Sequence, residues 1–429
     1  MFVVNKIEVS NDGKRISYDY SVSSVISKYF KKKERLYISY SEDVSSVPDS
    51  LKIVPLIANI MPIAWFVGFD VVVEELDKEF YNSINQIKEK FKEYYSKIPS
   101  DKSNLVVKNL VDTSKINQSE RSAMLFSGGV DTYCTFFRHC NEKLDLITIN
   151  GADIKLDDVK QWNDVLQYNV DTEVIKGNLK YYIASNFRDF ITFEVDKLLP
   201  DLAWWGKVQH GLCLTCAAAP LSYIKGFSLV YIASSYTRKE NYDLIIWGSM
   251  PEIDNLIKFG DTKILHDAEE LTRQEKIVSV VNSKFNSSIP LLRVCYSDNK
   301  VGLNCSNCEK CLRTIIAIMI SGANPNLHGF EVDEEIFLKL NNIIKNGFSS
   351  SGNRLFWNEI YEYSIANSGF YNENEVMWNK GYEQFFANLQ SILEIKLREI
   401  SPWNKIKLSI MNAFPKTFKF YLKIRRKQL

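Results

Sequence analysis

Apolar and polar positions follow different patterns in successive parts of the chain. Residues 7–20 alternate on both sides of an Asn-Asp-Gly turn at 11–13, which predicts a β-hairpin. Residues 35–40 predict another strand, and residues 80–95 carry apolar side chains at helical spacing, which predicts an amphipathic helix. Residues 1–115 are therefore predicted to form an N-terminal α+β module with a structural, substrate-shaping or dimerising role.

Strands and helices alternate from about residue 119. Strands are predicted at 122–126, 144–150, 172–175 and 228–235, with helices after the first strand and over 157–167. This alternation predicts an α/β fold with a doubly wound parallel sheet over residues 116–325.

Polar residues follow three of these strands. Ligands bind at the carboxyl ends of the strands in such sheets. Ser127, Asn150, Ser234 and Ser235 all lie at these ends. They are predicted to line the binding site.

The last part of the chain, residues 326–429, reads as a helical C-terminal region, with helices over 333–346 and 382–400. Its tail, 401–429, contains eight Lys or Arg and no Asp or Glu, interleaved with aromatic residues. A solvated tail, contact with an anionic membrane surface and contact with nucleic acid all fit this pattern.

The most apolar window covers residues 51–73. Lys52, two prolines and Asp70 interrupt it, so we predict a buried helix followed by a strand rather than a membrane span. The first residues lack the pattern of a signal peptide, and we expect a cytoplasmic protein. In that reducing compartment the eight cysteines are expected to be metal ligands or core residues rather than disulfides.

Length and composition agree with this view. The chain has 429 residues, 45% of them hydrophobic, and a formal net charge of +1. These values are typical of a globular protein of two or three domains, and the net charge favours no particular partner.

The first candidate for chemistry is a loop between a predicted strand and a predicted helix. Its residues are Ser127, Gly128, Gly129, Val130, Asp131 and Thr132. Glycines let the backbone approach a ligand closely, and the N–H groups at a helix N-terminus point at an anion. A plain strand–turn–helix junction would show the same residue types, and the loop lacks the Lys-Ser/Thr pair of a Walker A motif.

This loop resembles the PP-loop of the ATP-pyrophosphatase superfamily, whose core is a HUP-like α/β sheet. There the loop holds the β- and γ-phosphates of ATP while a substrate oxygen attacks the α-phosphorus, so AMP is transferred and pyrophosphate leaves. The resemblance implies that the loop residues bind pyrophosphate and that Asp131 orients Mg²⁺ or the loop.

Four cysteines form a second candidate site, with the spacing C-x9-C-x2-C-x2-C. They are Cys295, Cys305, Cys308 and Cys311. This spacing predicts a closed tetrahedral zinc site with a structural role, a zinc knuckle. An Fe–S cluster and four unlinked core cysteines are the alternatives.

The loop and the cysteines together resemble the queuosine-pathway 7-cyano-7-deazaguanine synthases, over roughly residues 120–320. In that group an ATP-activated carboxylate reacts with ammonia to give an amide and then a nitrile, and the cysteines bind structural zinc. The N-terminal module, the helical region and the segment between Ser235 and Arg293 depart from that group. We therefore expect a divergent relative with a different acceptor, either a small molecule or a protein terminus.

Further residues are candidates for acceptor or phosphate contacts. Residues 204–211 combine two tryptophans with His210, a candidate general base, although aromatic core packing fits them equally. Arg273 and Lys276 are candidates to neutralise the leaving group, on a helix predicted to begin with a Thr272–Glu275 capping box, although an exposed helix face would look the same. Residues 248–254 offer hydroxyls and carboxylates, among which Asp254 would assist Mg²⁺.

These observations predict an ATP- and Mg²⁺-dependent ligase that adenylates an acceptor carboxylate or amide oxygen. Ammonia, free or from a partner protein, or another amine would displace AMP, and a homodimer is one expected assembly. One alternative is a thiolase of tRNA or a metabolite that uses Cys213 and Cys216, although these lie in a small-residue helix that favours buried, inert thiols. Another is an ATP-binding scaffold without turnover.

Overall fold

A β-hairpin opens the chain, as its alternating pattern predicts. Strand β1 (Phe2–Val9) pairs antiparallel with β2 (Arg15–Val22). The turn between them contains Gly13, whose φ is +73° and whose missing Cβ leaves room for Asp43. Glycine is favoured there because L side chains rarely adopt this backbone conformation.

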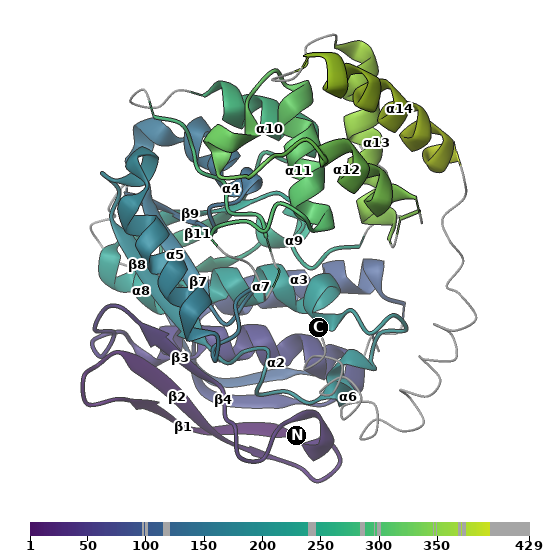
Figure 1. Ribbon diagram of the computed structural model, residues 1–429. Coiled ribbons are helices and arrows are strands. Elements are labelled where there is room, and N and C mark those ends of the chain that lie inside the picture. Colours follow the sequence, from purple (N-terminus) through teal and green to yellow (C-terminus); the bar gives the residue numbers. More distant parts are fainter. Residues whose placement is uncertain are drawn as a thin grey trace. The chain divides into compact units, whose positions relative to one another are not determined.

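The structure is a computed structural model, and it describes most of the chain (Figure 1). The described residues are 1–96, 98, 102–114, 121–238, 246–283, 288–295, 297, 302–345, 347–348, 350–367, 370 and 375–394, with the backbone alone for 375–380. The basic tail at 401–429 lies outside these residues.

The described residues form one sheet of eleven strands, in the order β10-β11-β9-β6-β7-β8-β3-β2-β1-β4-β5. The other strands are β3 (Tyr37–Tyr40), β4 (Val71–Asp77), β5 (Leu105–Val111), β6 (Arg121–Leu125), β7 (Asp145–Asn150), β8 (Lys180–Ser185), β9 (Phe227–Ala233), β10 (Lys258–Phe259) and β11 (Thr262–Asp267). Strands β11, β9, β6, β7 and β8 are parallel to one another, as the alternating pattern predicts.

Strands of the predicted N-terminal module and of the predicted core belong to this same sheet. They join where β3 pairs antiparallel with β8, which makes the sheet mixed. Tyr37 N–H donates to Asn186 Oδ1 at 3.0 Å, and Ser185 Oγ donates to Tyr37 O at 2.7 Å. The fold is therefore α/β with a large, mostly parallel mixed sheet.

Helices connect the strands. Up to residue 332 they are α1 (Asp49–Lys52), α2 (Val54–Val67), α3 (Lys78–Tyr94), α4 (Val130–Arg138), α5 (Val159–Asp171), α6 (Phe193–Asp196), α7 (His210–Cys216), α8 (Ala219–Lys225), α9 (Pro251–Asp254), α10 (Arg273–Asn282) and α11 (Glu309–Ile320). Single 3₁₀ turns occur at Ser27–Tyr29, Cys140–Glu142, Glu173–Ile175 and Pro325–His328, and a π-helical turn at Trp205–Gln209. In Figure 1, α4, α10 and α11 lie together, in agreement with the packing of α10 on both of the others.

One predicted strand is wrong. Residues 172–175 are not a strand: Glu173–Ile175 form a 3₁₀ turn, and the strand of the sheet is β8 at Lys180–Ser185. The apolar side chains of Val174 and Ile175 are buried in the turn that follows α5. The helical hydrogen-bond pattern extends up to this turn, since Thr172 N–H donates to Tyr168 O at 3.0 Å. Burial therefore explains the apolar pattern that suggested a strand.

The apolar window 51–73 folds as the sequence predicts, into buried α2 followed by β4. Val54–Trp65 are all buried in α2, which explains why this helix has no polar face. None of the described helices combines the length and apolar character that crossing a bilayer requires.

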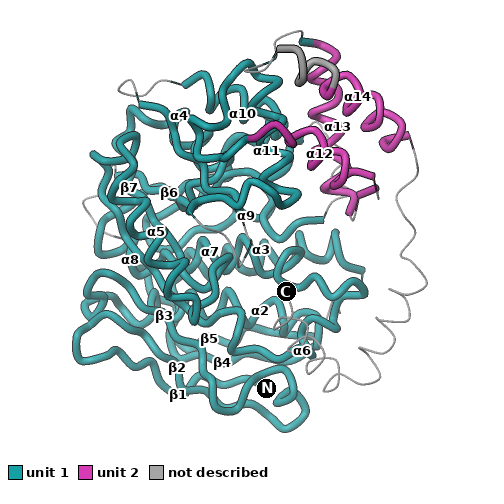
Figure 2. Tube along the Cα trace, viewed as in Figure 1, with its two compact units in different colours: residues 1–332, 367–371 teal, residues 333–366, 372–429 magenta. Residues whose placement is uncertain are grey.

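Contacts divide the chain into residues 1–332 with 367–371 and residues 333–366 with 372–429 (Figure 2). The second unit contains α12 (Ile336–Ile344), α13 (Ser351–Ala366) and α14 (Glu375–Glu394). Their core is aromatic, with the ring of Phe385 6.4 Å from Phe337 and 6.1 Å from Trp357. The helical prediction for this region is confirmed over these ranges, while residues 395–400 lie outside the described part.

Candidate functional site

The Ser127–Thr132 loop connects the end of β6 to the start of α4. Gly129 is the N-cap of α4, and the first intrahelical bond is Tyr133 N–H to Gly129 O at 3.0 Å. The N–H groups of the first turn therefore have no helical acceptor and point out of the helix end. This is the geometry that favours an anion.

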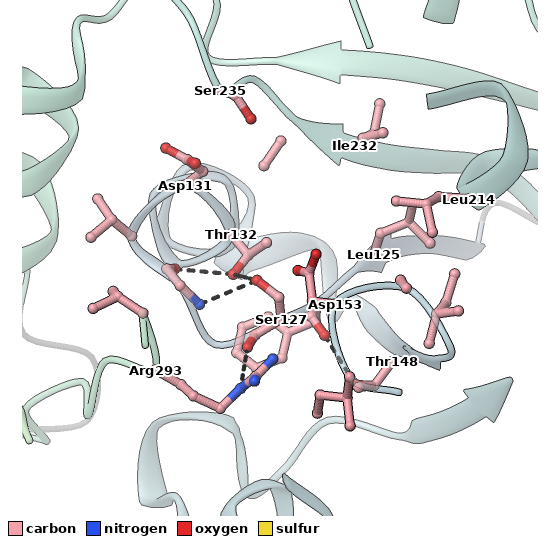
Figure 3. A pocket seen from close by; sticks show the side chains of 18 of the residues that line it. Leu125, Ser127, Asp131, Thr132, Thr148, Asp153, Leu214, Ile232, Ser235 and Arg293 are labelled. Atoms are coloured by element: carbon pink, nitrogen blue, oxygen red, sulfur yellow. Dashed lines mark hydrogen bonds between the residues drawn. The ribbon is translucent and has the colours of Figure 1, made fainter. Parts of the chain in front are cut away.

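Side chains of the loop hold it in this shape. Thr132 Oγ1 donates to Gly129 O at 3.0 Å, and Gly129 N–H reaches Ser127 Oγ at 3.3 Å (Figure 3). The second bond is long, so a phosphate oxygen would compete with it readily for the Gly129 N–H.

Any L residue in place of Gly128 would strain the backbone of the loop. Its φ is +76°, and a Cβ there would lie 2.8 Å from the ring of Tyr168. Tyr168 is itself fixed, since its hydroxyl donates to Leu291 O at 2.7 Å and lies 2.6 Å from the hydroxyl of Tyr133.

The loop lines a cavity at the carboxyl ends of β6, β7 and β9. The cavity encloses about 170 Å³ and opens to solvent. Residues of the loop, of β7 and the segment after it, and of α7 form its walls, including Thr148, Asp153 and Leu214 (Figure 3). A parallel sheet is expected to bind its ligand at this edge.

Most of the predicted site residues meet at this cavity. Ser127, Gly129, Val130, Asp131, Thr132, His210, Ser235 and Arg273 line it. Gly128 shapes the loop without lining the cavity, whereas Asn150, Ser234 and Lys276 lie outside its lining.

Lys276 and Ser234 have a different role from the predicted contact with phosphate or ribose. Lys276 is buried in α10, and its Nζ donates to Ser234 O at 2.6 Å. This bond fixes α10 to the end of β9. The predicted capping box of Thr272 and Glu275 is confirmed, so α10 begins where the sequence places it.

Asp131 and Arg273 form an ion pair across the cavity. Arg273 Nη2 lies 2.8 Å from Asp131 Oδ2, with both side chains mostly buried. The other carboxylate oxygen, Asp131 Oδ1, is buried and has no hydrogen-bond partner among the described residues. A buried acceptor without a partner is costly, so this oxygen is available for a cation or a donor that enters with the ligand.

His210 lies in the cavity wall at the end of the π-helical turn. Trp205 and Trp247 flank its ring, each with centroids 5.3 Å away. Its Nδ1 is buried and has no hydrogen-bond partner in the described part of the chain. Burial lowers the pKa of His210, so the ring is neutral at pH 7 and Nδ1 can accept or donate a hydrogen bond. Single π-helical turns occur often at functional sites.

Asp254, the other carboxylate considered for Mg²⁺, lies away from the cavity lining. Ser249 Oγ donates to its Oδ2 at 2.6 Å, and His266 Nδ1 lies 2.8 Å from the same oxygen. All three side chains are buried. This network fixes the loop after residue 246 against β11.

Two cations in the cavity wall were missed by sequence reasoning. Arg293 donates through its backbone N–H to Gly128 O at 2.7 Å and through Nε to Ser127 O at 2.9 Å. Lys310 lies between two of the cluster cysteines and also lines the cavity. Burial, and next the charge of Arg273, lower the pKa of Lys310 to about 7, and the negative charge of a bound phosphate would raise it again and keep the amine protonated. The sequence did offer one signal for both residues, since each lies within two positions of a predicted metal ligand. Those ligands follow the loop by more than 160 residues, so the sequence did not show that they lie near it.

The four cysteines come together as predicted. Their sulfurs all lie within 4.8 Å of one another, with Cys295–Cys308 and Cys305–Cys311 at 3.9 Å. Four Zn–S bonds of about 2.3 Å in a tetrahedron place the sulfurs about 3.8 Å apart. The group could therefore hold one zinc ion.

Backbone N–H groups point at two of the four sulfurs. Ser297 N–H reaches Cys295 Sγ and Cys308 N–H reaches Cys305 Sγ, each at 3.3 Å. Hydrogen bonding with Cys311 lowers the pKa of Cys308, whereas the same hydrogen bond raises the pKa of Cys311 and burial raises that of Cys295. Without a metal the cluster therefore favours a thiolate at Cys308 and thiols at Cys295 and Cys311. Metal ligation would then complete a site that the fold has largely assembled.

We expect purified protein to contain about one zinc ion per chain, and Cys305→Ser to lose it. Metal analysis of the two proteins by mass spectrometry checks this. Cys140→Ser is the matched control, because Cys140 is half-buried outside the cluster. Equal zinc content in wild-type and Cys305→Ser protein would contradict the metal site.

A second prediction concerns pH. Burial lowers the pKa of His328 from its ordinary value of 6.5, and its Nδ1–H donates to Pro290 O at 3.0 Å. The unfolded chain then binds more protons below pH 6.5 than the folded chain, so stability falls as pH decreases through that value. We expect the difference in melting temperature between wild type and His328→Gln to shrink from about pH 8 to about pH 5.5. A constant difference would contradict this.

We compared the chain with protein-family models, curated proteins and solved structures. No family model, no curated protein and no solved structure matches the chain.

Proposed function

We propose that the protein is an ATP-dependent ligase that adenylates an acceptor carboxylate or amide oxygen and releases pyrophosphate. One observation carries the proposal: a glycine loop at a helix N-terminus faces a cavity together with Arg273, Arg293 and Lys310. Three cations and a row of helix N–H groups suit a polyphosphate better than a neutral ligand. The resemblance of the loop to the PP-loop adds the position of attack, at the α-phosphorus.

The proposed reaction has two balanced steps. An acceptor oxygen attacks the α-phosphorus of ATP, and the bond to the bridging oxygen breaks; a carboxylate then gives an acyl-adenylate, an amide gives an imidoyl adenylate, and pyrophosphate leaves in both cases. Ammonia or an amine then attacks the activated carbon, AMP leaves, and one proton goes to solvent. In this proposal neutral His210, whose Nδ1 has no hydrogen-bond partner among the described residues, first accepts that proton and then passes it to solvent.

The cations of the cavity have separate tasks in this scheme. Arg273 moves from Asp131 to the departing pyrophosphate, which frees the carboxylate. Asp131 would then hold Mg²⁺, which supplies neutralising charge to the phosphates when bound. Because Oδ1 of Asp131 already lacks a protein partner among the described residues, the carboxylate fits this role.

Nucleotide product analysis tests the proposal. Purified protein is incubated with ATP, Mg²⁺ and ammonium, with and without 7-carboxy-7-deazaguanine, and nucleotides are separated by chromatography. AMP and pyrophosphate are expected, and their dependence on the deazaguanine acid decides whether the queuosine-type acceptor is used. ADP as the product would refute attack at the α-phosphorus. Tight ATP binding without AMP, with any acceptor, would favour a scaffold.

The thiolase alternative has a direct test in Cys213→Ser and Cys216→Ser. Both thiols are buried in α7, and burial raises the pKa of each. A buried, protonated thiol is a poor nucleophile. We expect both variants to keep AMP formation within about two-fold of wild type, measured in the same assay. Loss of activity in a variant that remains folded by circular dichroism would favour sulfur transfer.

A further inference from the structure

The four-cysteine cluster adjoins the phosphate loop through residues of its own two segments. We propose that the cluster positions Arg293 and Lys310 on the phosphate site, so that metal binding and phosphate binding are coupled. This inference rests on the proposed function and assigns the cluster a role in substrate binding beyond holding the fold together.

The first connection runs through Arg293. Its backbone N–H and its Nε donate to the carbonyl oxygens of Gly128 and Ser127, the first two residues of the loop. Cys295 follows two residues later and itself lines the cavity. Arg293 is therefore a positioning residue, which fixes the loop by holding two of its carbonyl groups.

Asn304 fixes the same segment from the side of the cluster. Its Oδ1 accepts from Val294 N–H at 2.9 Å and from Cys295 N–H at 3.2 Å, and its Nδ2 donates to Leu292 O at 2.7 Å. Asn304 is buried and directly precedes Cys305. A displacement of Cys305 would therefore be passed by hydrogen bonds to the residues on both sides of Arg293.

The second connection runs through Lys310. It lies between Cys308 and Cys311 in the first turn of α11 and lines the cavity with Arg273 and Arg293. When both cysteines bind one ion, the backbone of Lys310 has little freedom. The ammonium group then has a defined position from which to contact a phosphate oxygen.

Loss of the ion removes the bonds that hold the four sulfurs together. The segments that contain Cys295 and Cys305–Cys311 are then connected by hydrogen bonds alone, those of Asn304 among them. Arg293 and Lys310 lose their fixed positions, and the loop carbonyls lose part of their support. Affinity for phosphate is expected to fall, and by reciprocity phosphate binding must alter the metal site by the same free energy.

Calorimetric titration of the full-length protein with magnesium pyrophosphate tests the two cations. Lys310→Met and Arg293→Lys are each expected to weaken pyrophosphate binding about ten-fold while zinc content stays unchanged. Arg293→Lys keeps the charge and removes the Nε–H that Ser127 O accepts. The control is Lys108→Met, since Lys108 is exposed on β5 and pairs with Glu74. Affinities within two-fold of wild type in both variants would overturn the proposal.

Cobalt substitution tests the coupling without removing the metal, so the fold is preserved. Thiolate-bound Co²⁺ absorbs visible light, and its spectrum reports the geometry of the four sulfurs. The spectrum is expected to change on saturation with magnesium pyrophosphate, and this change should be reduced in Lys310→Met. An unchanged spectrum in a sample that calorimetry shows to be saturated would overturn the coupling.

The two proposals fail in different ways. A wild-type chain that binds neither ATP nor pyrophosphate would refute the proposed function and the coupling together. A chain that binds pyrophosphate and forms AMP, with affinity indifferent to Lys310→Met and Arg293→Lys, would refute the coupling alone.

Discussion

Asp131→Asn is expected to lower the rate of AMP and pyrophosphate formation by about 100-fold or more, with the fold retained. The substitution keeps the size of the side chain and removes its charge. It breaks the ion pair with Arg273 and leaves a neutral amide where the proposal places Mg²⁺. Chromatographic measurement of AMP at saturating ATP and Mg²⁺ gives the rate.

Asp171→Asn is a suitable control for Asp131→Asn. Asp171 ends α5 and is exposed, and its carboxylate accepts hydrogen bonds from Gln167 Nε2. This control is expected to retain full activity. If Asp131→Asn also keeps full activity and its dependence on Mg²⁺ is unchanged, the role of Asp131 at the metal and the phosphates is refuted.

Gly128→Ala is expected to abolish measurable ATP binding and to lower the free energy of unfolding by about 1–3 kcal/mol. Two physical effects add. An L residue is strained at a φ of +76°, and the new methyl group would lie 2.8 Å from the ring of Tyr168. The ring cannot easily move, because the hydroxyl of Tyr168 is held by Leu291 O and Tyr133. The loop must therefore shift, and its N–H groups with it.

Gly177→Ala is the matched control for Gly128→Ala. No atom lies within 4 Å of a Cβ built at Gly177, and its φ is outside the left-handed region. Titration calorimetry gives ATP binding, and urea unfolding followed by circular dichroism gives stability. Gly177→Ala should match wild type in both. Wild-type ATP affinity in Gly128→Ala would show that the loop does not bind the phosphates in this conformation.

Local patterns were sufficient where a single segment decides its own structure. The hairpin β1–β2 follows from alternation around a turn with glycine, and α3 from apolar residues at helical spacing. The capping box of α10 is formed by residues three apart in the sequence, so it too was predictable. The C-x2-C-x2-C steps place three thiols within seven residues, so the cysteine cluster, which could hold a metal ion, was predictable too.

Local pattern failed at residues 172–175, because burial alone does not distinguish a strand from a buried 3₁₀ turn. It also did not predict that β3 would pair with β8. That pairing joins Tyr40 to Ile183, residues separated by more than 140 positions, and nothing in either strand specifies the partner. Sheet order depends on packing and chain connection together, so it is decided by the whole fold.

Some features of the candidate site likewise follow from local sequence, and others depend on the tertiary structure. The sequence by itself determined the glycine loop at 127–132, the cysteine cluster and the carboxyl-end positions, because each depends on residue type at short spacing. Only the tertiary structure decided that Arg293 and Lys310 meet the loop, that Asp131 pairs with Arg273, and that Lys276 holds Ser234 instead of facing the cavity. The physical reason is distance along the chain: charges and hydrogen-bond donors act through space over a few ångströms, and only folding brings residues 127–132, 273, 293 and 310 within that range.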